Sequence, residues 1–117
     1  SFEKLVDLNL EIIQHVKKYL GISARVMLLS ELGVEAKEPQ LSVEICRQLG
    51  ASQFLAQSSA KKYLDEGAFG KADVELKFFT PRPSIYPQLW GPFISNLSAF
   101  DLLFNCGPKA SDIIRKA

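Results

Sequence analysis

Segments with helical spacing alternate along this chain with short apolar runs, and this alternation limits the folds that are open to it. From Phe2 to Leu20, apolar residues recur every three or four positions, which is typical of an amphipathic helix, and Gly21 follows as a stop. The run Arg25–Ser30 is apolar without alternation, as expected of a buried parallel strand. Gln40–Leu49 then returns to helical spacing. This order favours a mixed α/β protein.

The second half of the chain continues the same alternation. Gln53–Ala56 is predicted to form a second short strand and Asp73–Phe79 a third, whose apolar and charged residues lie on opposite faces. Because helices alternate with strands, which implies parallel strands joined by right-handed crossovers, we expect residues 1–117 to form a single α/β domain. The expected architecture is a small three-layer sandwich, with a mostly parallel sheet of about three strands flanked by helices. The remaining predicted helices are Ala60–Leu64, Glu66–Lys71, Leu97–Cys106 and Pro108–Lys116.

Composition and charge argue against nucleic acid as a partner and against a membrane span. Of the 117 residues, 47% are hydrophobic and 23% charged, as in ordinary globular proteins, and the formal net charge is only +1. Such a balance gives no long-range field that would attract phosphates, so nucleic acid is not the expected partner. No apolar run approaches the ~18 residues of a membrane span, and no basic-then-apolar leader opens the chain. We therefore expect a cytoplasmic protein without a membrane span.

The two cysteines, Cys46 and Cys106, fall on predicted helices and outside any CxxC or Cys/His cluster. They are predicted to be buried free thiols, with a disulfide or a reactive nucleophile as the alternatives. The carboxylates show no spacing typical of a metal site or of an acid/base pair. The sequence therefore predicts no metal centre and names no cofactor.

The single histidine and the single tryptophan each allow a structural interpretation. His15 falls near Ile12 and Tyr19 on the predicted first helix, which favours a partly buried structural residue over a base or ligand. Trp90 is interpreted as a local anchor that closes a loop, and the alternative is a stacking platform for a sugar ring.

A candidate anion site follows the second predicted strand. Ligands of open α/β sheets gather beyond the carboxyl ends of the strands, where loops lead into the next helices. The hydroxyls of Ser58 and Ser59, the amides at the helix start and the lysines Lys61 and Lys62 would together bind a phosphate or carboxylate. The alternative is that the two serines only cap the helix.

Tyr86 and Gln88 are a second candidate for ligand binding. Prolines in this stretch exclude regular helix between Thr80 and Gln88. In extended backbone, residues two apart point the same way, so a phenol and a carboxamide share one face and would orient a sugar or a nucleobase. The alternative is that Tyr86 covers the core while Gln88 pairs with backbone.

Ser98, Asp101 and Asn105 fall along one face of the predicted helix that follows. Ser98 is expected to cap this helix, and Gly107 to end it. The Asp101 carboxylate would either receive a ligand hydroxyl or complete a capping box with Ser98. Asn105 is either part of the same site or a residue of the C-terminal turn.

The closing stretch resembles the C-terminal signature of the WbqC-like family of bacterial surface-polysaccharide gene clusters. The resemblance extends backwards to Phe54–Asp65, which is similar to a strand and loop of that family, and to Leu8 and Asn9 near its entry helix. The chain looks like the C-terminal portion of such a protein. The matching closing residues are Tyr86, Pro87, Gln88, Phe93, Leu97, Ser98, Asp101, Leu102, Leu103, Phe104, Asn105, Cys106 and Gly107.

The resemblance implies a component of surface-polysaccharide (O-antigen) or modified-sugar biosynthesis, with transfer of a group to or from a nucleotide-activated sugar as the implied reaction. The catalytic group is expected in an absent N-terminal half. The competing hypothesis is a non-catalytic ligand-binding or assembly domain, whose apolar first helix docks by self-association or against that missing half. The implied pocket is formed by Tyr86, Gln88, Ser98, Asp101 and Asn105, with Ser58, Ser59, Lys61 and Arg82 at its phosphate side.

Overall fold

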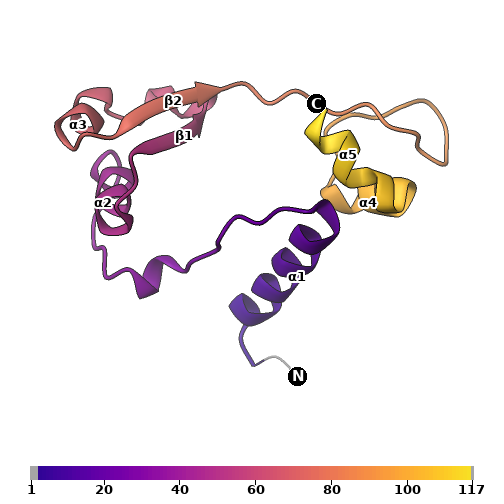
Figure 1. Ribbon diagram of the computed structural model, residues 1–117, viewed down its shortest axis with the longest axis horizontal. Helices are drawn as coiled ribbons and strands as arrows, with labels where there is room; N and C mark the ends of the chain where they lie inside the picture. Colours follow the sequence, from indigo (N-terminus) through magenta and orange to yellow (C-terminus); the bar gives the residue numbers. More distant parts are fainter. Residues whose placement is uncertain (1–2, 117) are drawn as a thin grey trace. The chain divides into compact units, whose positions relative to one another are not determined.

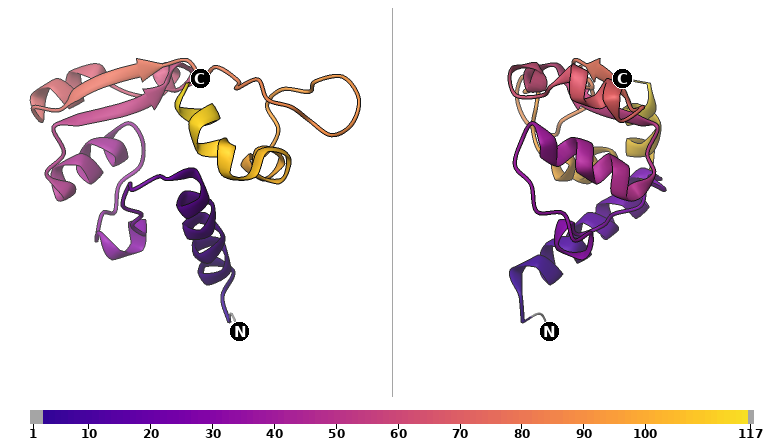
Figure 2. Two further views of the ribbon diagram at one scale, coloured as in Figure 1. Left: turned by 45° about the vertical axis from the view of Figure 1, so that its right-hand side comes forward. Right: turned by 90° about the vertical axis from the view of Figure 1, so that its left-hand side faces the viewer.

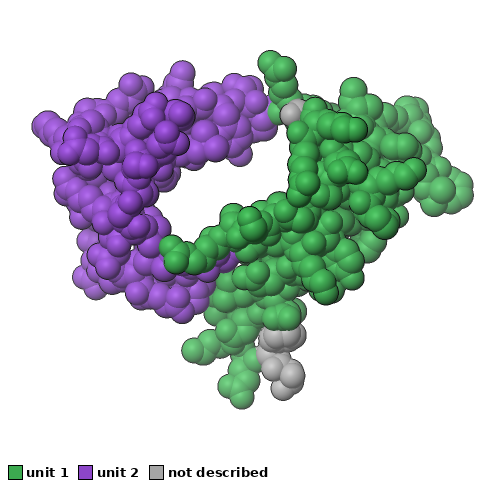
Figure 3. All heavy atoms as spheres, in the orientation of Figure 1, with its two compact units in different colours: residues 1–25, 82–117 green, residues 26–81 purple. Residues whose placement is uncertain are grey.

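The computed structural model describes residues 3–116 and divides them into two compact units. One unit consists of residues 26–81, and the other combines residues 3–25 with residues 82–116 (Figure 3). Each unit has its own buried apolar cluster.

The unit of residues 26–81 contains a parallel pair of strands, β1 (Gln53–Gln57) and β2 (Glu75–Phe79) (Figure 1). The two strands pair in register, from Gln53 opposite Glu75 to Gln57 opposite Phe79. A 3₁₀ helix at Ser58–Lys62 and the helix α3 (Glu66–Lys71) connect them. In β2, half-buried and exposed residues alternate, so the predicted strand with one exposed face is confirmed.

The core of this unit lies where helix α2 (Gln40–Leu49) and α3 meet the sheet. Its buried residues are Val43, Cys46, Phe69 and Val74. Phe69 is fully buried, and its ring lies 5.2 Å from that of Phe54 on β1. Because α3 has only six residues, its first amides need a local partner, and the Asp65 carboxylate accepts from two of them. Burial raises the pKa of the Cys46 thiol.

The other unit packs three helices, α1 (Leu5–Leu20), α4 (Ala99–Cys106) and α5 (Ala110–Arg115). Their shared core consists of Leu20, Leu102 and Ala110, and the helices meet at the C-terminal end of α1 (Figure 2). There Ser111 donates a hydrogen bond to the Leu20 carbonyl at 2.9 Å. Among residues 3–116, no helix is both long and apolar enough to cross a bilayer.

The expected α/β class is confirmed, because helices flank a small parallel sheet, but one predicted strand is wrong. Arg25–Ser30 does not pair with the sheet; Leu29–Glu31 forms a 3₁₀ turn instead. Met27 is exposed and Val26 only half-buried, so this run lacks the burial that an unalternating apolar strand implies. The sheet of the described residues therefore has two strands instead of about three.

Two predicted helices also differ in kind. The segment expected to be helical at Ala60–Leu64 is the 3₁₀ helix Ser58–Lys62, and Pro108 lies in another 3₁₀ turn, Gly107–Lys109, before α5. The predicted free thiols are confirmed: Cys46 is buried and Cys106 half-buried, and neither forms a disulfide. The single three-layer domain remains a prediction.

The packing of Phe69 leads to a stability prediction. Truncation by Phe69→Ala removes the largest fully buried side chain, and we expect it to lower the free energy of unfolding by about 3–5 kcal/mol, measured by urea denaturation. Leu55→Ala on β1 is the matched control, because the Leu55 side chain is 66% exposed and should cost much less. Equal losses for the two variants would contradict the assigned core.

Candidate functional site

The Asp101 carboxylate on α4 is the centre of a polar cluster that joins the helix to the preceding loop. The Tyr86 hydroxyl donates to Asp101 Oδ2 at 2.5 Å, and Gln88 Nε2 donates to the same oxygen at 3.1 Å. Asn105, one turn further along α4, donates to Asp101 Oδ1 at 3.2 Å. The prediction that Tyr86 and Gln88 share one side of an extended segment is thus confirmed.

The Gln88 carboxamide closes the loop by pairing with backbone. Its Nε2 donates to the Ile94 carbonyl at 2.8 Å, and its Oε1 accepts from the Ile94 amide at 2.9 Å. The amide therefore satisfies both backbone groups of one residue, as a neighbouring strand would. Inside the loop, the rings of Tyr86 and Phe93 meet edge to face, with centroids 5.5 Å apart.

Asn105 fixes the far side of the same loop. Its Oδ1 accepts from the Leu89 amide at 2.9 Å, and its Nδ2 donates to the Asp101 carbonyl at 2.7 Å. Cys106, the next residue, lies with its sulfur 3.9 Å from the Pro87 carbonyl. We call Tyr86, Gln88, Asp101 and Asn105 the loop clamp.

Of the two interpretations of Asp101, the structure tests the capping box, and the ligand-binding interpretation stays a prediction. Ser98 caps α4 as predicted, because its Oγ accepts from the Phe100 amide at 3.2 Å. The capping-box interpretation of Asp101 is wrong, since its oxygens are engaged by Tyr86, Gln88 and Asn105. Sequence spacing could not distinguish these cases, because two of the three partners of Asp101, Gln88 and Tyr86, lie 13 and 15 residues away.

Hydrogen bonding in the loop clamp shifts the pKa of Tyr86. The bond to Asp101 is the main cause that raises the pKa of the Tyr86 phenol above its ordinary value. Burial raises this pKa further, and the hydrogen bond from Gln88 acts in the opposite direction. The clamp therefore favours a neutral phenol that donates to a carboxylate.

Two members of the predicted site also border a cavity. Tyr86 and Ser98 line a space of about 220 Å³ beside Ser84 and Asn96. Gln88, Asp101 and Asn105 do not belong to its lining. The five predicted residues are therefore divided between this cavity and the loop clamp.

A separate cavity of about 290 Å³ opens beyond the carboxyl end of β1. Its polar lining comes from Glu38, Ser42, Gln57, Ser59 and Tyr63. The Ser42 hydroxyl donates to the Glu38 carboxylate. None of the residues that line this cavity is a lysine or arginine. We call it the β1 pocket.

The residues predicted to bind phosphate are not gathered in the β1 pocket. Ser59 lines it, but Ser58 donates to the Phe79 carbonyl at 3.0 Å and lies 3.0 Å from the Thr80 hydroxyl. The Lys61 ammonium lies 5.0 Å from the centre of the Phe78 ring. Arg82 belongs to the helical unit, whereas Ser58, Ser59 and Lys61 belong to the unit of residues 26–81.

Sequence reasoning missed Glu38 and Ser42 as partners. Glu38 was one of several scattered carboxylates, and it precedes helix α2 by two residues. Its distance of four positions from Ser42 was the available signal, since residues four apart lie on one side of a helical turn.

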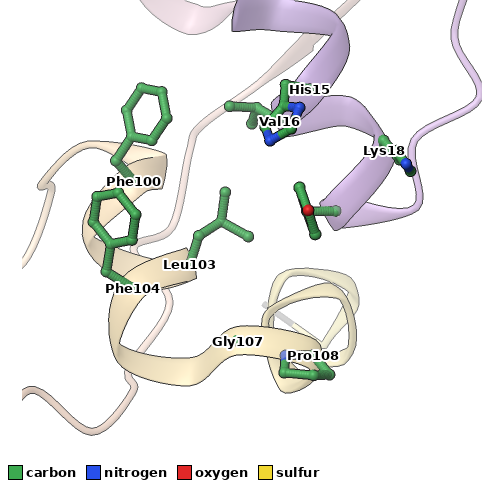
Figure 4. Close-up of a pocket in the computed structure, with 9 residues that line it drawn as sticks. His15, Val16, Lys18, Phe100, Leu103, Phe104, Gly107 and Pro108 are labelled. Atoms are coloured by element: carbon green, nitrogen blue, oxygen red, sulfur yellow. The ribbon is translucent and has the colours of Figure 1, made fainter.

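A third, apolar groove lies between α1 and α4, with a volume of about 600 Å³. Figure 4 shows Phe100 and Phe104 of α4 on one side and His15 and Val16 of α1 on another. His15 is exposed and meets the Tyr19 ring edge to face at 4.8 Å, so the prediction of a partly buried histidine is wrong.

Trp90 is 83% exposed at the tip of the clamped loop. Its predicted role as an anchor is wrong, because Gln88 closes this loop and the indole is not buried. The alternative, a stacking platform for a sugar ring, stays a prediction.

These features define a small α/β protein with a hydroxyl-lined pocket at the end of a parallel sheet and a clamped loop on a helical unit. The chain belongs to the WbqC-like protein family, whose model matches residues 1–113. It is also 31% identical over 109 residues to the uncharacterized protein Rv1507c of Mycobacterium tuberculosis. That match covers 92% of this chain and 47% of the relative, so the chain spans about half of the relative's length. No solved structure matches the chain significantly.

The clamp yields a prediction for Asp101→Asn. A carboxylate accepts on both oxygens, whereas an amide turns its NH₂ group toward either Asn105 or the Tyr86 and Gln88 donors. We expect Asp101→Asn to lower the free energy of unfolding by about 1–3 kcal/mol, measured by urea denaturation. Asp112→Asn on α5 is the matched control, because it removes the same charge from an exposed position. Indistinguishable unfolding curves for the two variants would contradict the clamp.

The raised pKa of Tyr86 predicts a loss of stability in alkali. Below pH ~10 the phenol is protonated in both states, and its hydrogen bond contributes fully. As the pH rises through the folded pKa, the unfolded chain has already released its proton, so the contribution is lost. Unfolding free energies measured across alkaline pH should fall more steeply for the natural chain than for Tyr86→Phe.

Tyr63→Phe serves as the control for this titration, since Tyr63 is exposed and lies outside the clamp. It should retain the steep alkaline decline. An unchanged decline in Tyr86→Phe would show that the Tyr86 phenol is not its source.

Proposed function

We propose that this chain supplies a sugar-binding unit to a WbqC-like protein of surface-polysaccharide (O-antigen) or modified-sugar biosynthesis. The proposed reaction of the whole protein is transfer of a group to or from a nucleotide-activated sugar. The observation that supports the binding role is the β1 pocket, which combines one carboxylate with several hydroxyls and an amide.

The β1 pocket suits a neutral, hydroxyl-rich ligand. A sugar donates hydrogen bonds from several hydroxyls, and the Glu38 carboxylate accepts such bonds more strongly than a neutral group does. Ser59 and Gln57 add groups that both donate and accept. The rings of Phe54 and Tyr63 supply apolar surface for the C–H face of a sugar ring.

The position of the β1 pocket supports the same proposal. Ligands of α/β sheets bind beyond the carboxyl ends of parallel strands, where β1 leads into its 3₁₀ helix. A volume of about 290 Å³ is at the small end of the usual range for ligand sites, which fits a single sugar ring better than a whole nucleotide sugar.

The charged part of a nucleotide-activated sugar needs cations that the pocket lining does not provide. We propose that Lys61 and Lys62, on the 3₁₀ helix that carries Ser59, face the diphosphate outside the pocket. Both are exposed, and Lys61 would leave the Phe78 ring to do so. A phosphate role for Ser58 and Arg82 stays a prediction.

For the other predicted substrate residues, we propose a division of labour. Tyr86 and Ser98 would contact ligand in the cavity of about 220 Å³ that they line. Gln88, Asp101 and Asn105 would act by holding the loop, because their polar atoms already pair within the clamp or with loop backbone. No catalytic residue is assigned to this chain.

Saturation-transfer NMR with monosaccharides and UDP-linked hexoses tests the sugar proposal. We expect binding that Ser59→Ala and Glu38→Gln each weaken about tenfold, as the loss of one hydrogen bond in a pocket predicts. Glu35→Gln is the matched control, since Glu35 is an exposed carboxylate in the same segment that does not line the β1 pocket.

Two variants are needed because Glu38→Gln also disturbs the hydrogen bond from Ser42 to Glu38. Ser59→Ala leaves that bond in place, so weaker binding by this variant reports on the pocket itself. Circular dichroism should show that both variants stay folded. The proposal is wrong if the natural chain shows no saturation transfer to any sugar of the panel, or if Ser59→Ala and Glu38→Gln bind as well as Glu35→Gln.

A further inference from the structure

Helix α1 exposes a regular apolar row. Leu5 is 72% exposed and Tyr19 54% exposed, and the residues between them in the row are exposed as well. The spacing of three and four that joins the members is the heptad pattern of a seam between two paired helices. We call this row the α1 seam; it consists of Leu5, Leu8, Ile12, His15 and Tyr19.

The flank of α1 next to the seam already has its partners. Leu20 is buried and Val16 half-buried against the core that Leu102 and Ala110 complete. The seam residues lie outside this core, so the seam is not part of the packing that buries Leu20. It is continuous with the apolar groove, because His15 and Tyr19 belong to both.

The groove extends the seam onto α4. Phe104 is exposed, and its ring stacks on that of Phe100 with centroids 5.9 Å apart (Figure 4). A continuous exposed apolar surface of this kind is typical of a site where a protein binds a partner.

We propose that the α1 seam binds the same seam of a second copy of this chain, in an antiparallel helix pair. Charge along α1 favours this partner. Asp7 lies in its first turn and Lys17 and Lys18 in its last turn. An antiparallel arrangement places the acidic start of each helix against the basic end of the other, and it opposes the helix dipoles favourably.

The charges beside the seam select one of the registers that the seam allows. With Leu8 opposite the partner's Tyr19 and Ile12 opposite the partner's His15, all four layers of the pair are filled by seam residues. Glu11 then lies beside the partner's Lys18, and two-fold symmetry repeats this ion pair. The register shifted by one heptad instead places Glu11 beside the partner's Glu11, which is repulsive.

Sedimentation equilibrium of the 117-residue chain, from micromolar to near-millimolar concentration, tests this pairing. We expect a monomer–dimer equilibrium. Glu11→Lys and Lys18→Glu should each weaken the dimer about tenfold or more, because two attractive pairs become two repulsive ones. Glu35→Lys makes the same charge change as Glu11→Lys outside α1 and should leave the dimer unchanged.

Restoring complementarity provides the decisive measurement. The double variant Glu11→Lys/Lys18→Glu should dimerise like the natural chain, and an equimolar mixture of the two single variants should form a heterodimer. The proposal is overturned if the natural chain is monomeric throughout, if the double variant stays as weak as the single ones, or if Glu35→Lys weakens the dimer equally. A monomer that binds 8-anilinonaphthalene-1-sulfonate in the groove would also overturn it, and would assign this surface to an apolar ligand.

Discussion

The helical unit depends on one carboxylate that is shared by donors from two segments. Asp101 lies on α4, whereas Tyr86 and Gln88 lie on the extended segment before the loop. A half-buried carboxylate is costly unless its lone pairs are occupied, and here three side chains occupy them. Gln88 donates both to Asp101 and to the Ile94 carbonyl. Asp101 is therefore linked through Gln88 to the far end of the loop.

The clamp also explains why large apolar side chains remain exposed next to it. Leu89, Trp90 and Ile94 lie on the loop that Gln88 closes, and the backbone of Leu89 and of Ile94 is held without burial of these side chains. In a loop held by its own side chains, the tip need not contribute to the core. The indole of Trp90 is thus exposed between two backbone positions that the clamp residues hold.

Much of the local structure could be predicted from the sequence, because its causes lie within a few residues. The helical period of α1, the glycine after it and the Ser98 cap are all local features, and each is confirmed. The strand predicted at Arg25–Ser30 failed for the opposite reason. An apolar run becomes a strand only if a neighbour pairs with it, and pairing is decided by distant parts of the chain.

The candidate sites show the same limit. Spacing correctly placed Tyr86 and Gln88 on one side of an extended segment, but it could not show that their shared partner was Asp101. Glu38 and Ser59 line one pocket although the whole of α2 and β1 separate them in sequence. The meeting of Glu38 with Ser59 in one pocket is set by tertiary packing, and no local pattern encodes it.

The hydrogen bond from Ser111 to Leu20 joins residues 91 positions apart, and its consequence concerns the order in which the chain assembles. The unit of residues 26–81 is continuous, so its core can form as soon as that stretch has been synthesised. The helical unit is discontinuous: α1 emerges first and must wait for α4 and α5 at the other end. Closing so long a loop costs more entropy when the intervening chain is slack than when it has already collapsed. Folding of the inserted α/β unit therefore lowers the entropic cost of bringing α1 together with α4 and α5.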